Sequence, residues 1–376
     1  MIRKIGKGLL IMFLSTLSLV VTCCLLLSVL FRTGETGDSG STGQLSYGVL
    51  DRYDMYITNE ISNALEGVLE IDKVYWLSDA DPVAPKPNPS CFGQMQTASE
   101  LAGVLEQAKP LLDGQELLFS TQTQTAPGTN IYYYLDETIL AITWKLVIED
   151  TMYTVSEVKL AHPSQFRRFL AGGEYGSDIQ LHTTQMAQQV NAVVASSGDF
   201  YRFRRMGVIV YDGVVQRVDS EKVDTCYIND QGDLLFSYRG ELADMESAQA
   251  FVDKHNIRFS LAFGPVLIDG GETKRIYGYG LGEIDSNYAR AALCQRGPIH
   301  YLLVTANAEG NYRTTPSLHT MQKHLETFGC EKVYTLDGGQ TAAIVMNGEL
   351  MNRVVYGYQR NISDIIYFAT ALPEGG

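Results

Sequence analysis

The sequence predicts an α+β fold, in which a mixed β-sheet packs against helices and one transmembrane helix precedes the domain. Strand-like runs separated by turn pairs such as Asp212-Gly213 favour antiparallel hairpins. A strand, helix and strand in succession between residues 300 and 336 favour a parallel pair of strands with a right-handed crossover. An uncharged apolar run from Gly8 to Phe31 is long enough to span a bilayer, for which a helix needs about 20 residues.

The charges around this apolar run predict its orientation. Arg3, Lys4 and Lys7 precede the run and Arg32 follows it, so the positive-inside rule places the N-terminus in the cytoplasm and the C-terminal domain outside the cell. A cleaved signal peptide is the alternative, but the run exceeds the usual apolar length of roughly 7–15 residues and lacks a clear A-x-A site. We therefore expect a single-pass membrane anchor over residues 1–32.

Composition divides the rest of the chain into three parts. Residues 33–43 read TGETGDSGSTG, which is the composition of a flexible linker. Residues 44–143 are expected to form an N-terminal extracellular region, with a proline-rich surface loop at residues 78–89. Residues 144–376 are expected to form the main domain.

Start, stop and turn signals predict the elements of this extracellular part in order. Residues 97–100 have the capping-box pattern, and Thr315-Pro316 supplies an N-cap followed by a proline at the first helical position. The predicted helices are 97–112, 163–171, 185–190, 245–255 and 315–328. The predicted strands are 116–121, 130–135, 138–147, 152–160, 192–196, 208–211, 214–218, 227–228, 234–238, 259–263, 266–268, 300–305, 332–336 and 342–346.

The net charge limits the possible classes of function, and the number of cysteines limits the possible disulfides. The whole chain has a net charge of −14, and its first 32 residues carry four cations and no acids, so the remaining residues carry −18. This balance excludes the basic surface typical of nucleic-acid-binding proteins. Four cysteines follow the apolar run: Cys91, Cys226, Cys294 and Cys330. One disulfide among the last three and buried free thiols are both compatible with an oxidising compartment.

The most informative segment is Asp337-Gly338-Gly339-Gln340-Thr341, which follows one predicted strand and precedes another. Two adjacent glycines permit φ > 0 and leave no side chain in the way of a ligand. A carboxylate stands at the strand exit and a hydroxyl stands just past the glycines, at the kind of loop where rigid scaffolds carry chemistry. A simple hairpin turn is the alternative interpretation.

Four segments in this order resemble the phosphodiester glycosidase family, over roughly residues 144–372. They are Val190-Asn191-Ala192 through Ser197-Gly198-Asp199-Phe200-Tyr201; Phe263-Gly264-Pro265-Val266-Leu267; Tyr288-Ala289-Arg290-Ala291-Ala292; and Leu336-Asp337-Gly338-Gly339-Gln340-Thr341. Residues 360–367 also fit. The chain departs from the family pattern at Ser197, which replaces an asparagine, at Gln340, which replaces a glycine, and at Glu309, where the family has an Asp-Gly-Arg segment.

The resemblance implies a hydrolase that cleaves the bond between a sugar C1 and a phosphate oxygen. Such a site needs a carboxylate for the oxocarbenium-like centre and phosphate donors, for which arginine has the best geometry. Asp337 and Asp199 are the candidate catalytic residues, and Arg290 is the candidate phosphate ligand. The other substrate-binding candidates are Gly338, Gly339, Gln340, Thr341, Ser197 and Gly198.

The resemblance also implies the partners: a phosphodiester-linked glycan or cell-envelope polymer of a bacterial, Gram-positive-like envelope. No cofactor is expected because the sequence has no G-x-G-x-x-G motif and no P-loop. No metal is expected because His319 and His324 do not share a helix face. The departures leave a catalytically inactive glycan-binding protein, or a structural envelope protein of the same fold, as open alternatives. An active site requires Asp199, Arg290 and Asp337 to converge.

Overall fold

The computed structural model describes residues 76–279 and 284–373. The predicted transmembrane helix, the linker and residues 44–75 lie outside these described residues. Within the described part, no helix combines the length and the apolar character needed to cross a membrane. Residues 74–376 cluster as one compact unit.

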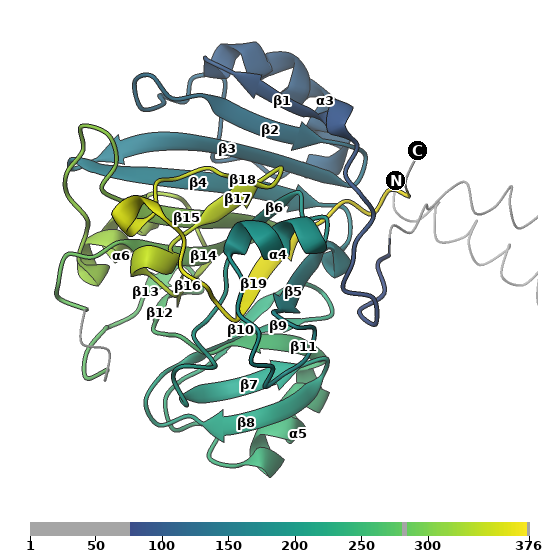
Figure 1. The fold of residues 1–376 in the computed structure, drawn as a ribbon, viewed down its shortest axis with the longest axis vertical. Helices are drawn as coiled ribbons and strands as arrows, with labels where there is room; N and C mark the ends of the chain where they lie inside the picture. Colours follow the sequence, from purple (N-terminus) through teal and green to yellow (C-terminus); the bar gives the residue numbers. More distant parts are fainter. Residues whose placement is uncertain (1–75, 280–283, 374–376) are drawn as a thin grey trace, which may run out of the picture. The chain divides into compact units, whose positions relative to one another are not determined.

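A nine-stranded sheet is the largest element of the fold (Figure 1), and its neighbouring strands pair antiparallel. In spatial order the strands are β1 (Phe92–Met95), β2 (Ile131–Leu135), β3 (Ile139–Ile148), β4 (Thr151–Leu160), β15 (His300–Asn307), β14 (Arg290–Gly297), β16 (Lys332–Leu336), β12 (Val266–Asp269) and β13 (Glu272–Thr273).

A five-stranded sheet packs against one face of the nine-stranded sheet. Its order is β18 (Glu349–Leu350), β17 (Ile344–Met346), β6 (Val194–Ser197), β19 (Asp364–Phe368) and β5 (Phe166–Leu170), again with antiparallel neighbours. Apolar side chains of both sheets, among them Leu303, Tyr334, Ile344 and Ile366, form one buried cluster. The two sheets therefore share a core.

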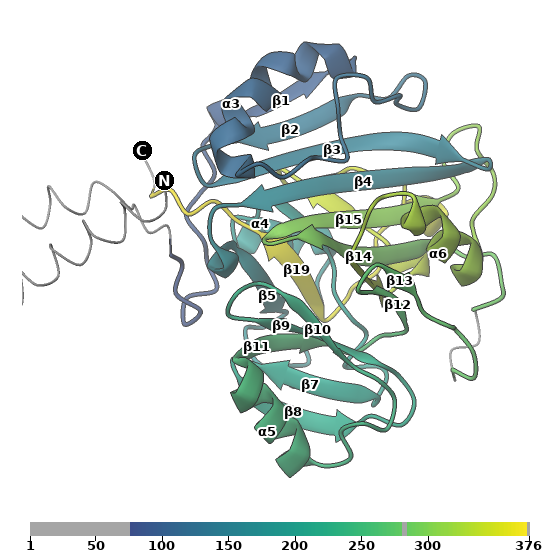
Figure 2. The same cartoon turned by 180° about the vertical axis from the view of Figure 1, so that it is seen from behind.

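Helices cover the outer faces of the two sheets. Helices α3 (Ala102–Leu112) and α6 (Leu318–Glu326) lie on the face of the nine-stranded sheet that is turned away from the five-stranded sheet (Figure 2). Ala108, Met321 and Leu325 of these helices belong to a second buried cluster on that face. Helix α4 (Thr183–Gln189) covers the five-stranded sheet through Met186 and Ala187.

A third group of strands extends from the sheets. It consists of the hairpin of β7 (Gly207–Tyr211) and β8 (Val214–Asp219), the sheet of β10 (Leu234–Ser237), β9 (Thr225–Asn229) and β11 (Ile257–Leu261), and helix α5 (Met245–His255). The hairpin predicted at Asp212-Gly213 is confirmed, and so is the predicted helix 245–255. Asp244 caps α5 by accepting a hydrogen bond from the Ser247 backbone at 2.8 Å, and Asn256 ends it with φ 50°.

The α+β class is confirmed, but the predicted parallel pair is wrong. Strands β15 and β16 run in the same direction, yet β14 lies between them and pairs antiparallel with both. A short turn joins β14 to β15, and the two strands form a hairpin. Strand β14 therefore pairs with the edge of β15 at which β16 was expected to pair. Ser317, and not Thr315, caps α6 by accepting a hydrogen bond from the Thr320 backbone at 3.1 Å.

Strand β3 spans residues 143 and 144, and strands β1, β2 and β3 all belong to the nine-stranded sheet. The predicted helix 163–171 is only a 3-10 turn, Pro163–Gln165, followed by strand β5. His162 and Gln165 form a capping box on that turn.

The cysteine alternatives are also decided. Cys91, Cys226, Cys294 and Cys330 are free, and the last three are buried. Buried cysteine behaves as a small apolar side chain, and Cys226 and Cys294 belong to the two main core clusters.

Candidate functional site

The segment Asp337–Thr341 joins the two large sheets. Strand β16, before it, pairs with β14 and β12 in the nine-stranded sheet, whereas β17, after it, pairs with β6 and β18 in the five-stranded sheet. The hairpin-turn interpretation is therefore wrong. The segment is a crossing loop at the end of β16, and it places Asp337 where the two sheets meet.

The two glycines of the loop permit close packing against the start of β14. The Gly339 backbone donates a hydrogen bond to the Ala289 carbonyl at 2.7 Å. A Cβ at Gly338 would lie 2.6 Å from the same oxygen, and a Cβ at Gly339 would lie 2.6 Å from the Tyr288 ring. Gly339 also has φ +66°, which favours glycine. These glycines face protein atoms, so they shape the loop more than they bind a ligand.

The polar side chains of the loop are also engaged with the protein. The Thr341 hydroxyl donates to the Gly338 carbonyl at 2.7 Å, and Gln340 Nε2 donates to the Tyr358 carbonyl at 3.1 Å. Both residues were predicted to bind substrate. In this geometry they hold the crossing loop in place.

Asp337 has an uncommitted, buried carboxylate oxygen. Its Oδ2 has no hydrogen-bond partner among the described residues. Burial raises the pKa of Asp337 to about 6, which the nearby Thr341 hydroxyl and the charges of Arg204 and Arg360 partly oppose and the charge of Asp199 reinforces. A carboxylate with this pKa accepts or releases a proton near neutral pH, as a general acid or base must.

Two arginines near Asp337 are held by aromatic rings. The Arg204 guanidinium lies over Phe200 and Phe263, at 5.5 and 5.3 Å from the ring centroids. The Arg360 guanidinium lies over Phe200 and Phe203, at 5.3 Å from each centroid. Cation–π contact positions these charges. Neither guanidinium forms a hydrogen bond or ion pair with the part of the chain that the structure describes, and Arg204 Nη1 is buried. Their N–H donors are therefore available to an anion.

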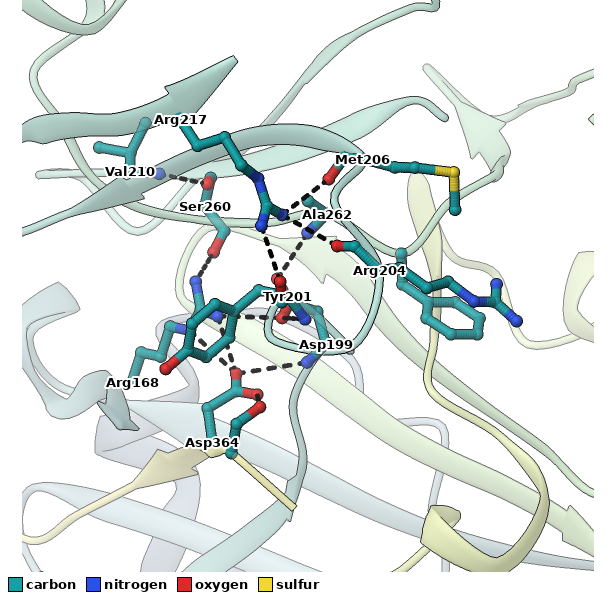
Figure 3. Close-up of polar contacts among 12 residues, drawn as sticks. Arg168, Asp199, Tyr201, Arg204, Met206, Val210, Arg217, Ser260, Ala262 and Asp364 are labelled. Carbon is teal, nitrogen blue, oxygen red and sulfur yellow. Dashed lines mark hydrogen bonds and ion pairs between the residues drawn. The ribbon is translucent and has the colours of Figure 1, made fainter. Parts of the chain in front are cut away.

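Asp199 belongs to a buried ion cluster with Arg168 and Asp364 (Figure 3). Arg168 Nη2 lies 3.1 Å from Asp199 Oδ1 and 3.0 Å from Asp364 Oδ2. Asp199 also accepts backbone hydrogen bonds from Tyr201 at 2.8 Å and from Ala262 at 2.7 Å. Both oxygens of Asp199 are thus engaged, and the residue is only 2% exposed. Its geometry is that of a brace beside Asp337.

Burial lowers the pKa of an arginine and raises that of an aspartate, and both effects act in this cluster. Burial disfavours the charged guanidinium of Arg168, but the carboxylates of Asp199 and Asp364 outweigh it and raise the pKa of Arg168. Burial raises the pKa of Asp364, and the Arg168 charge opposes that rise. Arg168 thereby remains charged while it holds two acidic strand ends together.

The segment Ser197-Gly198 connects this cluster to the Asp337 loop. The Asp337 backbone donates to the Gly198 carbonyl at 3.4 Å. A Cβ at Gly198 would lie 2.0 Å from Asp364 Oδ2, so glycine is required for the close approach of that carboxylate. Ser197 Oγ is buried without a hydrogen-bond partner among the described residues.

Arg290 lies at the start of β14, next to the crossing loop. Its side chain is buried, and its guanidinium donates to the Ser286 carbonyl at 2.7 Å and the Pro316 carbonyl at 3.4 Å. The Arg290 backbone packs against Gly338, but the cations that lower the pKa of Asp337 are Arg204 and Arg360. Asp199 and Asp337 come together, whereas the Arg290 guanidinium braces the segments before β14 and α6.

Sequence reasoning missed Arg168, Arg204, Arg360 and Asp364 as parts of the site. A usable signal was the alternation of aromatic and basic residues in Phe200-Tyr201-Arg202-Phe203-Arg204, which favours cation–π pairs. A second signal was Arg167-Arg168 inside an apolar strand, because buried arginine requires partners. Among the described residues no group of histidine, cysteine or acidic side chains has the geometry of a metal site.

One family model matches part of the chain. Residues 190–369 match the family model described as phosphodiester glycosidase, so the resemblance expected from the motifs is confirmed. No curated protein matches the sequence.

Solved structures give more distant matches. One is the zebrafish N-acetylglucosamine-1-phosphodiester alpha-N-acetylglucosaminidase catalytic domain, auto-inhibited by pro-peptide, at 17% identity and a TM-score of 0.49, covering 69% of this chain and 92% of that one. Another is a hypothetical protein from Synechocystis, at 13% identity and a TM-score of 0.46, covering 66% of this chain and 64% of that one.

Proposed function

We propose, from the match of residues 190–369 to the phosphodiester glycosidase family model, that the protein is a hydrolase of phosphodiester-linked glycans. The bond to be cleaved joins a sugar C1 to a phosphate oxygen. Two features of the Asp337 carboxylate carry this proposal. Its Oδ2 is buried without a hydrogen-bond partner among the described residues. The charges of Arg204 and Arg360 act on it, and the N–H donors of these arginines have no partner in the described chain.

Each group has a role that follows from its geometry. The guanidinium groups of Arg204 and Arg360 bind the phosphate and neutralise the charge that it gains as it leaves. The Asp337 carboxylate stabilises the positive charge that develops at C1 and takes a proton from the attacking water. The water oxygen bonds to C1, the C1–O bond breaks, and its electron pair leaves with the phosphate monoester. Asp199 and Arg290 are positioning residues in this scheme.

A glycan-binding protein without catalysis is the second candidate. The observation that favours it is that Gly339, Gln340 and Thr341 direct their hydrogen bonds into the protein, so the crossing loop supplies few donors to a substrate. In this case the arginines bind a phosphate that is never cleaved.

We also propose that residues 8–31 anchor the domain in the cell membrane, with the C-terminal domain outside the cell. The uncharged length of this run and the basic residues before it support the proposal. A phosphodiester-linked polymer of the cell envelope would then lie within reach of the site.

A turnover assay tests the hydrolase. The chain from residue 44 onward is incubated with a panel of methyl and glycerol phosphodiesters of hexose 1-phosphates, and released sugar is measured. We expect Asp337→Asn to lower kcat by about 100-fold or more, as for loss of a general base. We expect the double variant Arg204→Gln/Arg360→Gln to raise KM about tenfold or more, because it removes charged phosphate donors.

Arg205→Gln is the matched control for the arginines, because Arg205 is exposed and adjacent in sequence. It is expected to leave both kinetic constants unchanged. Folded wild-type protein that releases no sugar from any substrate contradicts the hydrolase. Saturable binding of the same phosphodiesters without turnover favours the second candidate.

A further inference from the structure

A cavity of about 410 Å³ lies beside the crossing loop that carries Asp337. Its lining includes Tyr288, Asn307, Arg313, Arg353 and Tyr356. The cavity is coupled to the loop in two places. The Tyr288 ring packs against Gly339, and the 3-10 turn Val355–Gly357 contacts the 3-10 turn Gly339–Thr341. A ligand in the cavity would therefore sit next to the proposed cleavage site.

An exposed aromatic pair stands at the edge of this cavity. Tyr356 is 78% exposed, and its ring stacks on that of Tyr358 at 6.4 Å between centroids. The Tyr356 backbone has φ 64°, a left-handed conformation that is an outlier for a bulky residue. Strained residues of this kind gather at binding sites. The strain here presents an aromatic ring to solvent, where it adds nothing to the core.

One residue that lines the cavity has a buried acceptor without a partner. Asn307 is only 2% exposed, and its Nδ2 donates to the Arg353 carbonyl at 3.0 Å. Its Oδ1 is buried and has no hydrogen-bond partner among the described residues. A buried acceptor without a donor is unfavourable, and a ligand hydroxyl would satisfy it.

The charge of the cavity is positive although the chain is acidic. Arg313 and Arg353 are exposed, and neither guanidinium pairs with an acid in the described chain. The one acidic residue of the lining, Glu309, forms an ion pair with Lys145 and accepts a hydrogen bond from the Arg353 backbone at 3.1 Å. The two guanidinium groups therefore remain available to an anionic ligand.

We propose that this cavity is a second glycan subsite, which binds the neighbouring phosphate-bearing repeat of a polymeric substrate. The proposal rests on the proposed function. The Tyr356 and Tyr358 rings stack against a sugar, Asn307 Oδ1 accepts one of its hydroxyl groups, and Arg313 and Arg353 bind the phosphate of that repeat. The substrate is accordingly a polymer with a phosphodiester in each repeat, and the enzyme recognises more than the bond that it cleaves.

A matched pair of substrates tests the subsite. The first is a single hexose 1-phosphodiester, and the second is an oligomer of several hexose 1-phosphate repeats. Wild-type protein is expected to show a KM for the oligomer about tenfold below that for the single unit, because charge-assisted contacts add to binding. Arg313→Gln/Arg353→Gln is expected to abolish this difference and to leave the KM of the single unit unchanged.

Tyr356→Asn provides a second variant that keeps the backbone. Asparagine tolerates the left-handed conformation, so this variant removes the ring without adding strain. We expect a raised KM for the oligomer, an unchanged KM for the single unit and an equal or higher Tm. Tyr277→Asn, at an exposed tyrosine outside the cavity, is the control and is expected to change neither KM.

Equal KM values for the two substrates in the wild type would overturn the subsite. So would variants that raise the KM of the oligomer and the KM of the single unit by the same factor. Calorimetric titration with the oligomer separates this result from failure of the hydrolase. Binding without turnover that depends on Arg313 and Arg353 supports the subsite and rejects the hydrolase. Absence of binding rejects the subsite.

Discussion

At the scale of single residues, Asp337 is placed for chemistry at the expense of stability. Its Oδ2 is buried without a hydrogen-bond partner in the described chain, and burial raises its pKa to about 6. Asp199, by contrast, accepts two backbone hydrogen bonds and pairs with Arg168. Two carboxylates side by side thus have different environments, which is the arrangement that separates reactive from structural acids.

This contrast predicts the pH dependence of an Asp337→Asn variant. The folded-state pKa lies above the ordinary value of 3.8, so the folded protein holds this proton more tightly, and stability falls as pH rises from about 4 to about 6. The variant removes this loss. We expect it to be more stable than wild type by roughly 1–3 kcal/mol at pH 8 and equally stable at pH 4.

Urea unfolding at the two pH values measures this difference. Asp230→Asn, at an exposed position, is the control. A variant that is less stable than wild type at pH 8 would show that Asp337 braces its loop, and the catalytic assignment would then lose its physical basis.

At the scale of elements, the site is built where strand ends from different sheets meet. Strands β5, β6 and β19 bring Arg168, the 197–199 segment and Asp364 together in the five-stranded sheet. Strand β16 brings Asp337 from the nine-stranded sheet. The Asp364 carboxylate packs directly against Gly198, which has no side chain to obstruct it.

Gly198→Ala is therefore expected to destabilise the fold strongly. The new Cβ would lie 2.0 Å from Asp364 Oδ2, so the carboxylate must move away from Arg168 and leave buried charges unpaired. The expected loss is about 3–5 kcal/mol, as for a broken buried ion pair. Urea unfolding again measures it.

Gly103→Ala is the matched control, because a Cβ there meets no atom within 4 Å and the residue lies in helix α3. It is expected to stabilise by roughly 0.5–1 kcal/mol, since alanine is the better helix former. Equal effects of the two substitutions would contradict the role assigned to Gly198.

At the scale of the whole molecule, residues 74–376 form one compact unit with the proposed site inside it. The proposed membrane anchor precedes this unit in sequence. Localisation and catalysis are therefore separable properties, each of which is tested with its own part of the chain.

Cell fractionation tests the anchor. We expect the full chain to remain in the membrane fraction after washing at high salt, and the chain from residue 44 onward, expressed without residues 1–43, to be soluble. Protease added to intact cells is expected to digest the C-terminal domain, because the basic residues before the apolar run place the N-terminus inside. Full-length protein in the soluble fraction, or a domain protected in intact cells, would contradict the anchor or its orientation.

The sequence by itself determined the local features of this protein. Turn pairs such as Asp212-Gly213 marked the hairpins, the amphipathic pattern of residues 245–255 marked α5, and the ordered motifs marked the resemblance to the family whose model matches residues 190–369. These signals act over a few neighbouring residues. They also marked Asp337 as the most informative carboxylate. The apolar run that predicts the membrane anchor is a local signal of the same kind.

Only the tertiary structure decided what these local features become together. Strand neighbours are chosen by packing between distant segments, so β14 separates β15 from β16, and residues before 144 join the main sheet. The same packing directs the Arg290 guanidinium to the Ser286 and Pro316 carbonyls and leaves Arg204 and Arg360 to flank Asp337. A side chain's partner depends on what the fold brings near it, and contacts between separate elements of the fold leave no local pattern to detect.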